Sequence, residues 1–169
     1  GNVASKARSD VNMLVAVNPS TKNILMINTP RDYYITLKSK GKKDKLTHAG
    51  LYGVEESLNS LSSFYDTDID YYIRINFTSF VKIVDELGGI KVNVPLKFCE
   101  QNSKRSKAPK DLICLNKGVQ NLNGEQALAL ARHRKTLATG DRGRGENQML
   151  VLEAIMNKAM SPKIVSKYS

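Results

Sequence analysis

The spacing of apolar residues changes several times along this chain of 169 residues. In some stretches they run together or alternate with polar residues, as in residues 69–75, which is typical of β-strands. Elsewhere they recur every three or four positions, as in amphipathic helices. Because the two patterns follow one another repeatedly, we predict an α/β protein, a layered α-β-α sandwich in which helices flank a central mixed β-sheet.

The strand patterns begin near the start of the chain. Residues 11–17 are typical of a buried strand, and a turn at residues 18–21 leads to the apolar run 24–27, so that a hairpin is expected. A further short strand follows Pro30. Strands are also expected at the alternating stretch 69–75 and at residues 90–94.

Four helices are predicted, three from the wider spacing and the one over residues 124–132 from Ala and Leu residues that favour a helix. They cover about residues 49–65, 80–87, 124–132 and 144–160. Gly88-Gly89 ends the second helix, and Asn123 can cap the third. The lysine run 38–45 is interpreted as a solvated loop, with contact to an anionic polymer or a lipid surface as the alternative. His48 is interpreted as a residue at a helix start.

Length, charge and apolar runs restrict the class of protein. The chain fits a single domain spanning residues 1–169, and its formal net charge of +10 favours a phosphate-bearing, polyanionic or membrane-surface partner. The longest apolar run, residues 13–17, is far shorter than the ~20 residues that cross a bilayer. Since the chain starts without Met or a signal pattern, we expect a targeting segment to have been removed.

Cys99 and Cys114 bracket a polar loop rich in Lys and Ser. They lack the spacing of a zinc site, so a disulfide is predicted, with two buried thiols as the alternative. A disulfide would stabilise the chain by about 3 kcal/mol in the chain-entropy model and would require an oxidising compartment.

Residues 131–148 contain the strongest concentration of positive charge. Arg132, Arg134, Arg142 and Arg144 lie within thirteen positions. Two guanidinium groups ~5 Å apart would repel by roughly 3 kcal/mol at an effective dielectric near 20, so their convergence requires an anion. Phosphate suits the planar guanidinium fork. The alternative is a solvated basic loop with splayed side chains, and residues 135–140 are interpreted as a mobile flap.

A second set of charges flanks the expected hairpin. Arg8 and Asp10 precede its first strand, and Arg31 and Asp32 follow its second, so all four side chains should lie at one end of the sheet. Carboxylates beside arginines are typical of magnesium-assisted phosphoryl transfer. An ordinary surface salt bridge between Asp10 and Arg8 is the alternative.

These motifs, in this order and spacing, resemble the LytR-CpsA-Psr (LCP) phosphotransferases of bacterial cell walls, most closely their streptococcal capsule-associated branch. The similar segments are Arg8-Ser9-Asp10, Asn28-Thr29-Pro30-Arg31-Asp32, Lys45-Leu46-Thr47-His48-Ala49-Gly50, residues 77–90, Leu122-Asn123-Gly124-Glu125-Gln126-Ala127-Leu128, Ala131-Arg132-His133-Arg134 and residues 141–148. The resemblance implies transfer of a glycopolymer, of capsular polysaccharide or teichoic acid type, from polyprenyl pyrophosphate to a peptidoglycan hydroxyl, with release of polyprenyl phosphate.

The resemblance also implies residue roles. Asp10 would bind the cofactor Mg²⁺, Gln148 would help to position the pyrophosphate, and the arginines that would hold it are Arg8, Arg31, Arg132, Arg134 and Arg144. Arg31, Asp10 and Asp32 are the catalytic candidates, and the proton acceptor is Asp10 or Asp32. Relatives usually carry another metal-binding Asp upstream of Arg8, before this chain begins, and often an Arg where this chain has Asn147.

The resemblance further implies an enzyme anchored in the cell membrane by an N-terminal segment that has been removed, with its catalytic domain on the extracellular face. Its partners would be the polyprenyl-linked glycopolymer and peptidoglycan. Two alternatives are a polyprenyl pyrophosphate hydrolase and a non-catalytic polyprenyl-phosphate-binding or regulatory module. A nucleic-acid-binding role is not expected, because no helix-turn-helix, zinc-finger or RNP-type motif is present.

Overall fold

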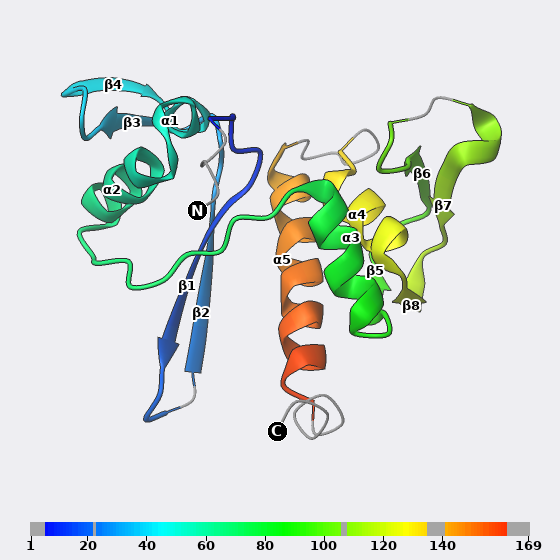
Figure 1. The fold of residues 1–169 in the computed structure, drawn as a ribbon. Coiled ribbons are helices and arrows are strands. Elements are labelled where there is room, and N and C mark those ends of the chain that lie inside the picture. The colour runs from blue at the N-terminus through cyan, green and yellow to red at the C-terminus, as the bar shows by residue number, and fades with distance from the viewer. Residues whose placement is uncertain (1–5, 22, 106–107, 135–140, 162–169) are drawn as a thin grey trace. The chain divides into compact units, whose positions relative to one another are not determined.

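The structure is a computed structural model, and it describes residues 6–21, 23–105, 108–134 and 141–161. The chain folds into two compact units, Gly1–Ile73 and Arg74–Ser169 (Figure 1). Both units combine helices with antiparallel strand pairs, which confirms the α/β class. A single domain over residues 1–169 stays a prediction.

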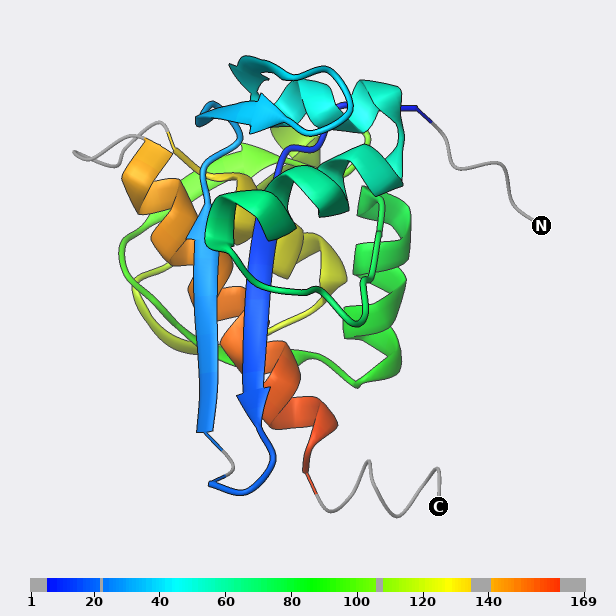
Figure 2. The ribbon, with the colours of Figure 1, turned by 90° about the vertical axis from the view of Figure 1, so that its left-hand side faces the viewer.

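The first unit begins with the expected hairpin. β1 (Asn12–Asn18) pairs with β2 (Asn23–Thr29) in a register that runs from Asn12 opposite Thr29 to Asn18 opposite Asn23. The Asn18 carboxamide oxygen accepts hydrogen bonds from the backbone N–H groups of Ser20 and Thr21, which shapes the turn. The prediction that the first strand is buried is wrong. The hairpin extends away from α1 and α2 of this unit (Figure 2), and the last four side chains of β1, residues 15–18, are exposed.

The remainder of this unit is a second hairpin with two helices. β3 (Tyr34–Leu37) pairs with β4 (Lys42–Lys45), followed by α1 (Leu46–Tyr52) and α2 (Val54–Tyr65). The lysine run is therefore partly a strand, because its second half pairs with β3. The single helix expected over residues 49–65 is two helices, because Gly53 leaves the helical conformation at φ 122° and ψ 170°.

The alternating residues 69–75 do not form the expected strand. Among the described residues they have no ladder partner, and Tyr71 and Ile73 are 91% and 90% exposed. Alternation indicates a pleated backbone, but a strand also requires hydrogen bonds to a neighbouring strand. That second condition cannot be read from the segment itself.

The second unit follows the predicted order of elements more closely. It contains α3 (Phe77–Glu86), β5 (Ile90–Val94), β6 (Phe98–Gln101), a 3₁₀ turn (Pro109–Asp111), β7 (Leu112–Leu115), β8 (Gly118–Leu122), α4 (Gly124–Arg132) and α5 (Asp141–Ala159). β5 pairs with β8, and β6 with β7, both antiparallel. Gly88 and Gly89, with φ of 73° and 82°, end α3 as expected.

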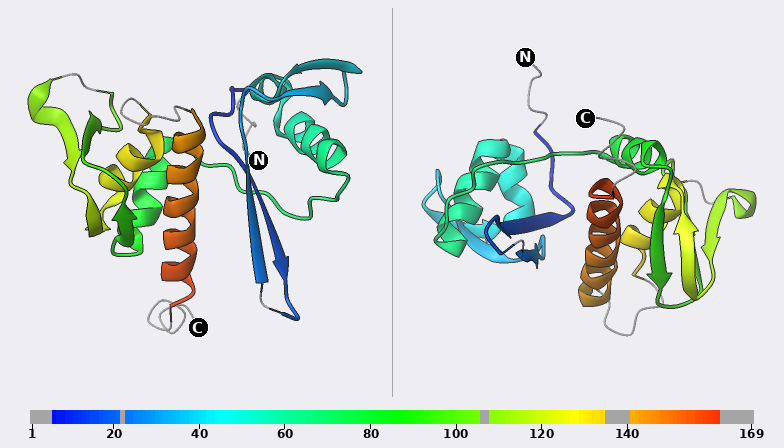
Figure 3. Two further views of the ribbon diagram at one scale, coloured as in Figure 1. Left: turned by 180° about the vertical axis from the view of Figure 1, so that it is seen from behind. Right: turned by 90° about the horizontal axis from the view of Figure 1, so that it is seen from below.

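The core of the second unit lies between its helices and strands, as Figure 3 shows. Val84, Ile90, Leu122 and Leu130, which come from α3, β5, β8 and α4, are almost fully buried. Asn123 caps α4 as predicted, in a reciprocal capping box with Gln126. The capping box fixes where α4 begins.

Strand pairing differs in one respect from the expected central mixed sheet. Within the described residues, the strands form four two-stranded antiparallel sheets. The missing ladder at residues 69–75 accounts for part of the difference, since a mixed sheet needs extended segments beyond the hairpins. No helix in the described part of the chain is both long and apolar enough to span a bilayer.

Candidate active site

Asp10 and Arg31 meet at the end of the first hairpin, as the sequence predicts. Arg31 Nη1 donates to Asp10 Oδ1 at 2.7 Å, and the two side chains are 34% and 51% exposed. The register explains the contact: Asn12 lies opposite Thr29, so the residues just before β1 and just after β2 leave the ladder together. The charged pair is accessible to a ligand from solvent.

Asp32 extends this pair into a chain of alternating charges. Its Oδ2 lies 3.5 Å from Arg31 Nε, and its Oδ1 accepts a hydrogen bond from Lys45 Nζ at 3.1 Å. The hydrogen bond from Lys45 lowers the pKa of Asp32 from its ordinary value, with a further contribution from the Arg31 charge, against an opposing effect of burial. Arg31 is thus held between two carboxylates.

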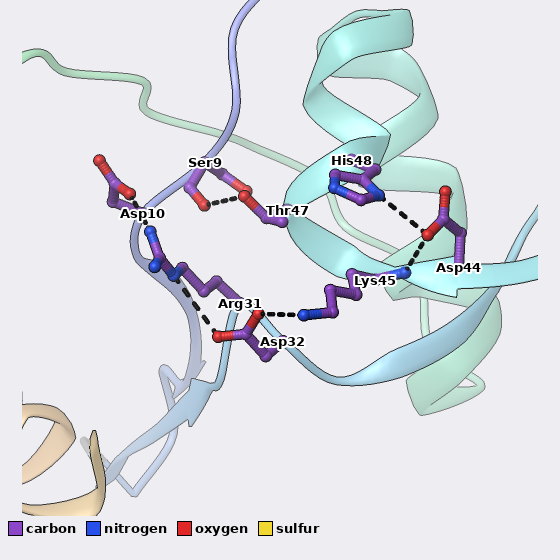
Figure 4. A network of polar contacts seen from close by, with 8 residues as sticks. All are labelled: Ser9, Asp10, Arg31, Asp32, Asp44, Lys45, Thr47 and His48. Carbon is purple, nitrogen blue, oxygen red and sulfur yellow. Dashed lines mark hydrogen bonds and ion pairs between the residues drawn. The ribbon is translucent and has the colours of Figure 1, made fainter. Parts of the chain in front are cut away.

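The first turn of α1 holds the backbone around this cluster. Thr47 N donates to Arg31 O at 2.8 Å, and Thr47 Oγ1 donates to Ser9 O at 2.9 Å (Figure 4). The segment before Asp10 approaches the same helix closely at Gly50, whose O accepts a hydrogen bond from Ala7 N at 3.2 Å. One helix therefore contacts both segments that carry the predicted residues.

Asp44 and His48 form a second polar pair beside Lys45. His48 Nδ1 lies 2.9 Å from Asp44 Oδ1, which also accepts the backbone N–H of Lys45 at 2.7 Å (Figure 4). These two hydrogen bonds, chiefly the one with His48, lower the pKa of Asp44. His48 lies in the first turn of α1, which confirms its interpretation as a residue at a helix start.

Within the second unit, the end of α4 positions Arg132 and Gln148. Arg132 Nη1 donates to the carbonyl oxygen of Asn102 at 3.1 Å, and its Cζ lies 5.1 Å from the ring centroid of Phe77. Gln148 Nε2 donates to Ala131 O at 3.3 Å, so α5 is joined to the last turn of α4. Gln148 is thus bonded to the backbone of the residue just before Arg132.

His133, between the two predicted arginines, is almost fully buried. Its ring stacks on Phe98 with centroids 4.0 Å apart, and its Nδ1 lies 3.5 Å from Glu100 Oε2. The burial of His133 anchors the residue that separates Arg132 from the exposed Arg134. It thereby fixes where the chain leaves α4.

The other predicted residues have more varied surroundings. Arg8 is exposed and lies two residues before Asp10, while Arg144 is half-buried in the first part of α5. The flap expected at residues 135–140 lies outside the described residues. Convergence of arginines from both units on a single anion stays a prediction.

The predicted disulfide is confirmed. Cys99 and Cys114 lie opposite one another in the β6–β7 ladder, with an S–S bond of 2.07 Å and a Cα–Cα distance of 4.1 Å. Both residues are exposed, whereas Phe98 and Leu115 next to them are buried. The bond therefore joins β6 and β7 near the end of their ladder that is remote from the connecting loop.

The chain is similar in sequence to known proteins of one family. The model of the LytR_cpsA_psr family matches residues 2–169. The chain belongs to this family. It is 40% identical to the polyisoprenyl-teichoic acid–peptidoglycan teichoic acid transferase TagT of Bacillus subtilis, over 99% of the chain and 51% of that protein. The chain thus spans about half the length of this relative.

Solved structures of LytR-CpsA-Psr proteins have a fold similar to that of this chain. The crystal structure of B. subtilis TagV matches with a TM-score of 0.83 and 34% identity, over 96% of this chain and 61% of that one. A family protein, YwtF (TagT), with bound octaprenyl pyrophosphate lipid matches with a TM-score of 0.73 and 34% identity, over 96% and 66%. The recognised family is therefore confirmed by sequence and by fold.

Sequence reasoning missed one member of the LytR-CpsA-Psr site region in this chain. Lys45 was assigned to a solvated loop, although it binds Asp32 and its backbone binds Asp44. The separation of 13 residues between Lys45 and Asp32 gives no local signal, because it depends on the β3–β4 pairing. Asp44 and His48 are only four residues apart in the sequence, but their contact joins the end of β4 to the start of α1.

Proposed function

We propose that the protein is a phosphotransferase that moves a polyprenyl-pyrophosphate-linked glycopolymer, of capsular polysaccharide or teichoic acid type, onto peptidoglycan. Family membership and the transferase named above support the reaction class. The observation that carries the proposal is Arg31, fixed between Asp10 and Asp32 at the strand ends and partly open to solvent. A guanidinium held in this way is ready to bind phosphate oxygens.

The reaction forms one bond and breaks one. A peptidoglycan hydroxyl oxygen bonds to the phosphorus next to the sugar, the bridging P–O bond breaks, and polyprenyl phosphate leaves with that oxygen. The hydroxyl proton passes to a base. Negative charge grows on the bridging oxygen as the bond breaks, so Arg31, joined by Arg132, Arg134 and Arg144 as the family resemblance implies, would stabilise the transition state.

Magnesium is part of this proposal. Among the described residues, no group of three or more His, Cys, Asp and Glu side chains could hold a metal ion. Mg²⁺ is commonly bound through one or two carboxylates together with substrate phosphates and water, a role that Asp10 fits. The buried Ser9 Oγ next to it, which has no hydrogen-bond partner within the described residues, offers a second oxygen. When bound, Mg²⁺ would neutralise charge on the phosphates.

The surroundings of Asp32 bear on the choice of proton acceptor. Lys45 and Arg31 both favour its ionised form, and the lowered pKa makes it a weak base. Its contacts suit it better to orienting Arg31 and Lys45 than to removing a proton. Asp10 is itself paired with Arg31 and proposed to bind Mg²⁺, so the proton acceptor stays the choice between Asp10 and Asp32.

We also propose that the protein acts at the outer face of the cell membrane. The exposed Cys99–Cys114 disulfide supports an oxidising compartment, because such bonds are rarely maintained in a reducing cytosol. Polyprenyl-linked donors would be reached there through an anchored protein. Fractionation of cells, with the thiol state of the two cysteines as the readout, tests this location.

The Arg31→Ala variant tests the proposed role of Arg31. Loss of a charge-stabilising group from the transition state should lower turnover by about 10²–10³-fold with the fold intact. Lys43→Ala, which removes an exposed cation from β4, is the matched control and should leave turnover unchanged. Normal turnover by Arg31→Ala would remove Arg31 from the site.

The acceptor is tested by following polyprenyl phosphate release with and without peptidoglycan fragments. Release that requires the fragments, together with a phosphodiester-linked product, supports transfer. Equal release in both conditions would indicate the hydrolase. No release in either condition, with lipid still bound, would indicate the non-catalytic binding module.

A further inference from the structure

Two guanidinium groups lie over the ring of Phe77, the first residue of α3. Arg132 Cζ is 5.1 Å from the ring centroid, and Arg105 Cζ is 5.8 Å from it. Each contact is of the cation–π type, worth about 0.5–1 kcal/mol at exposed sites. Both cations thus contact the same aromatic ring.

Arg105 lies on a turn that is tied to both ends of α4. Ser103 N donates to Glu125 Oε2 at 2.7 Å in the first turn of the helix, and the Ser103 hydroxyl bonds to the other oxygen of Glu125. At the other end, Asn102 O accepts from Arg132 Nη1 at 3.1 Å. Both oxygens of Glu125 are thus engaged in holding the turn.

The backbone at Arg105 is strained. Its φ is +57°, in the left-handed region that costs a non-glycine residue roughly 1 kcal/mol. Arg105 N donates to Asn102 O at 2.9 Å and closes the turn. The Cys99–Cys114 disulfide joins the strands from which the turn projects. Strain held in place by its surroundings is typical of binding sites, where it sets the direction of a side chain in advance.

From these contacts we propose that Arg105 and Arg132, supported by Phe77, form a subsite for a phosphate group. A phosphate beside Phe77 would accept charge-assisted hydrogen bonds from both guanidinium groups. Arg105 is exposed and Arg132 is half-buried, so a ligand can reach the pair from solvent. The subsite extends the anion site beyond the arginines that the family resemblance implies.

The phosphate can belong to the donor pyrophosphate or to a phosphodiester of the glycopolymer. This identification of the ligand rests on the proposed function, whereas the binding of phosphate does not. Two probes distinguish the sources: inorganic pyrophosphate, and glycerophosphoglycerol as a small phosphodiester. Their affinities can be measured by calorimetry at low salt without any transfer assay.

The test compares Arg105→Gln with Lys104→Gln. Both substitutions remove one exposed positive charge from the same turn, but only Arg105 lies over Phe77. We expect Arg105→Gln to weaken binding of at least one probe about tenfold, as loss of a charge-assisted hydrogen bond would, and Lys104→Gln to change it less than about twofold. If only pyrophosphate binding weakens, the subsite binds the donor pyrophosphate. If only binding of the diester weakens, the subsite binds a phosphodiester of the glycopolymer.

Three results would overturn the subsite: equal weakening by the two variants, no weakening by Arg105→Gln, or no binding of either probe to the unaltered protein. Phe77→Leu is a second variant, which keeps apolar bulk but removes the ring under both cations. It should also weaken binding while circular dichroism stays unchanged. Absence of transfer in a separate assay would contradict the proposed function and leave the phosphate subsite standing.

Discussion

At the scale of single residues, the absence of a side chain at position 50 helps to place Asp10. A Cβ there would overlap the carbonyl oxygen of Ala7, and it would lie 3.4 Å from Ala7 C and 3.5 Å from Ser9 N. The segment that carries Arg8 and Asp10 can therefore pack against α1 only because residue 50 is glycine. This dependence involves backbone atoms, which cannot rotate away as a side chain can.

We predict that Gly50→Ala lowers both stability and turnover. Alanine favours a helix by up to about 1 kcal/mol over glycine, but overpacking against fixed atoms typically costs about 1–3 kcal/mol. Thermal unfolding and transfer assays measure the two effects. Gly124→Ala is the control, because its Cβ would lie 2.7 Å from Val81 Cα in the other unit. Gly124→Ala should lower stability but reduce the turnover of the folded protein less than Gly50→Ala does. Equal losses of turnover in the two variants would count against a special role for Gly50.

At the scale of elements, Glu56 joins α2 to the turn between β3 and β4. Its carboxylate accepts the backbone N–H of Ser39 at 3.2 Å and the hydroxyl of Ser60 at 2.9 Å. Burial acts to raise the pKa of Glu56, but the hydrogen bonds, led by that from Ser39, outweigh burial and lower it. The ionised form is therefore favoured by folding.

A lowered pKa in the folded state predicts a defined acid dependence. The stabilisation by Glu56 is fully present above the pKa of the unfolded state, about 4.3, and is lost as the pH falls through the lower folded value. Glu56→Gln should therefore be less stable near neutral pH, and its free energy of unfolding should fall less on acidification. Urea unfolding between about pH 3 and pH 7 measures both slopes. Parallel curves for the two proteins would contradict this linkage.

Elements also show where sequence patterns were sufficient. Asn123 and the helix-favouring Ala and Leu residues that follow locate α4, because its cap and its composition are both local. The break at Gly53 was missed because the apolar spacing continues across it, although the residue type is a common interruption. The hairpin was predictable from two apolar runs and an Asn-Pro-Ser-Thr turn.

At the scale of the whole molecule, pairings distant in sequence were the least predictable. The Asp10–Arg31 pair could be foreseen because the hairpin register aligns its two ends. The position of Lys45 beside Asp32 depends on a second hairpin, and that of Arg105 over the Phe77 ring depends on a loop folding back onto α3. Such pairings require a tertiary arrangement that residue spacing alone does not specify.

The exposed bond between Cys99 and Cys114 is accessible to reductants. Cutting it would free a loop that spans a sequence separation of 15 and cost about 3 kcal/mol in the chain-entropy model. We expect dithiothreitol to weaken pyrophosphate binding by the protein but to leave its circular dichroism largely unchanged. A protein that entered a thiol-rich medium would then remain folded and lose its hold on the phosphate.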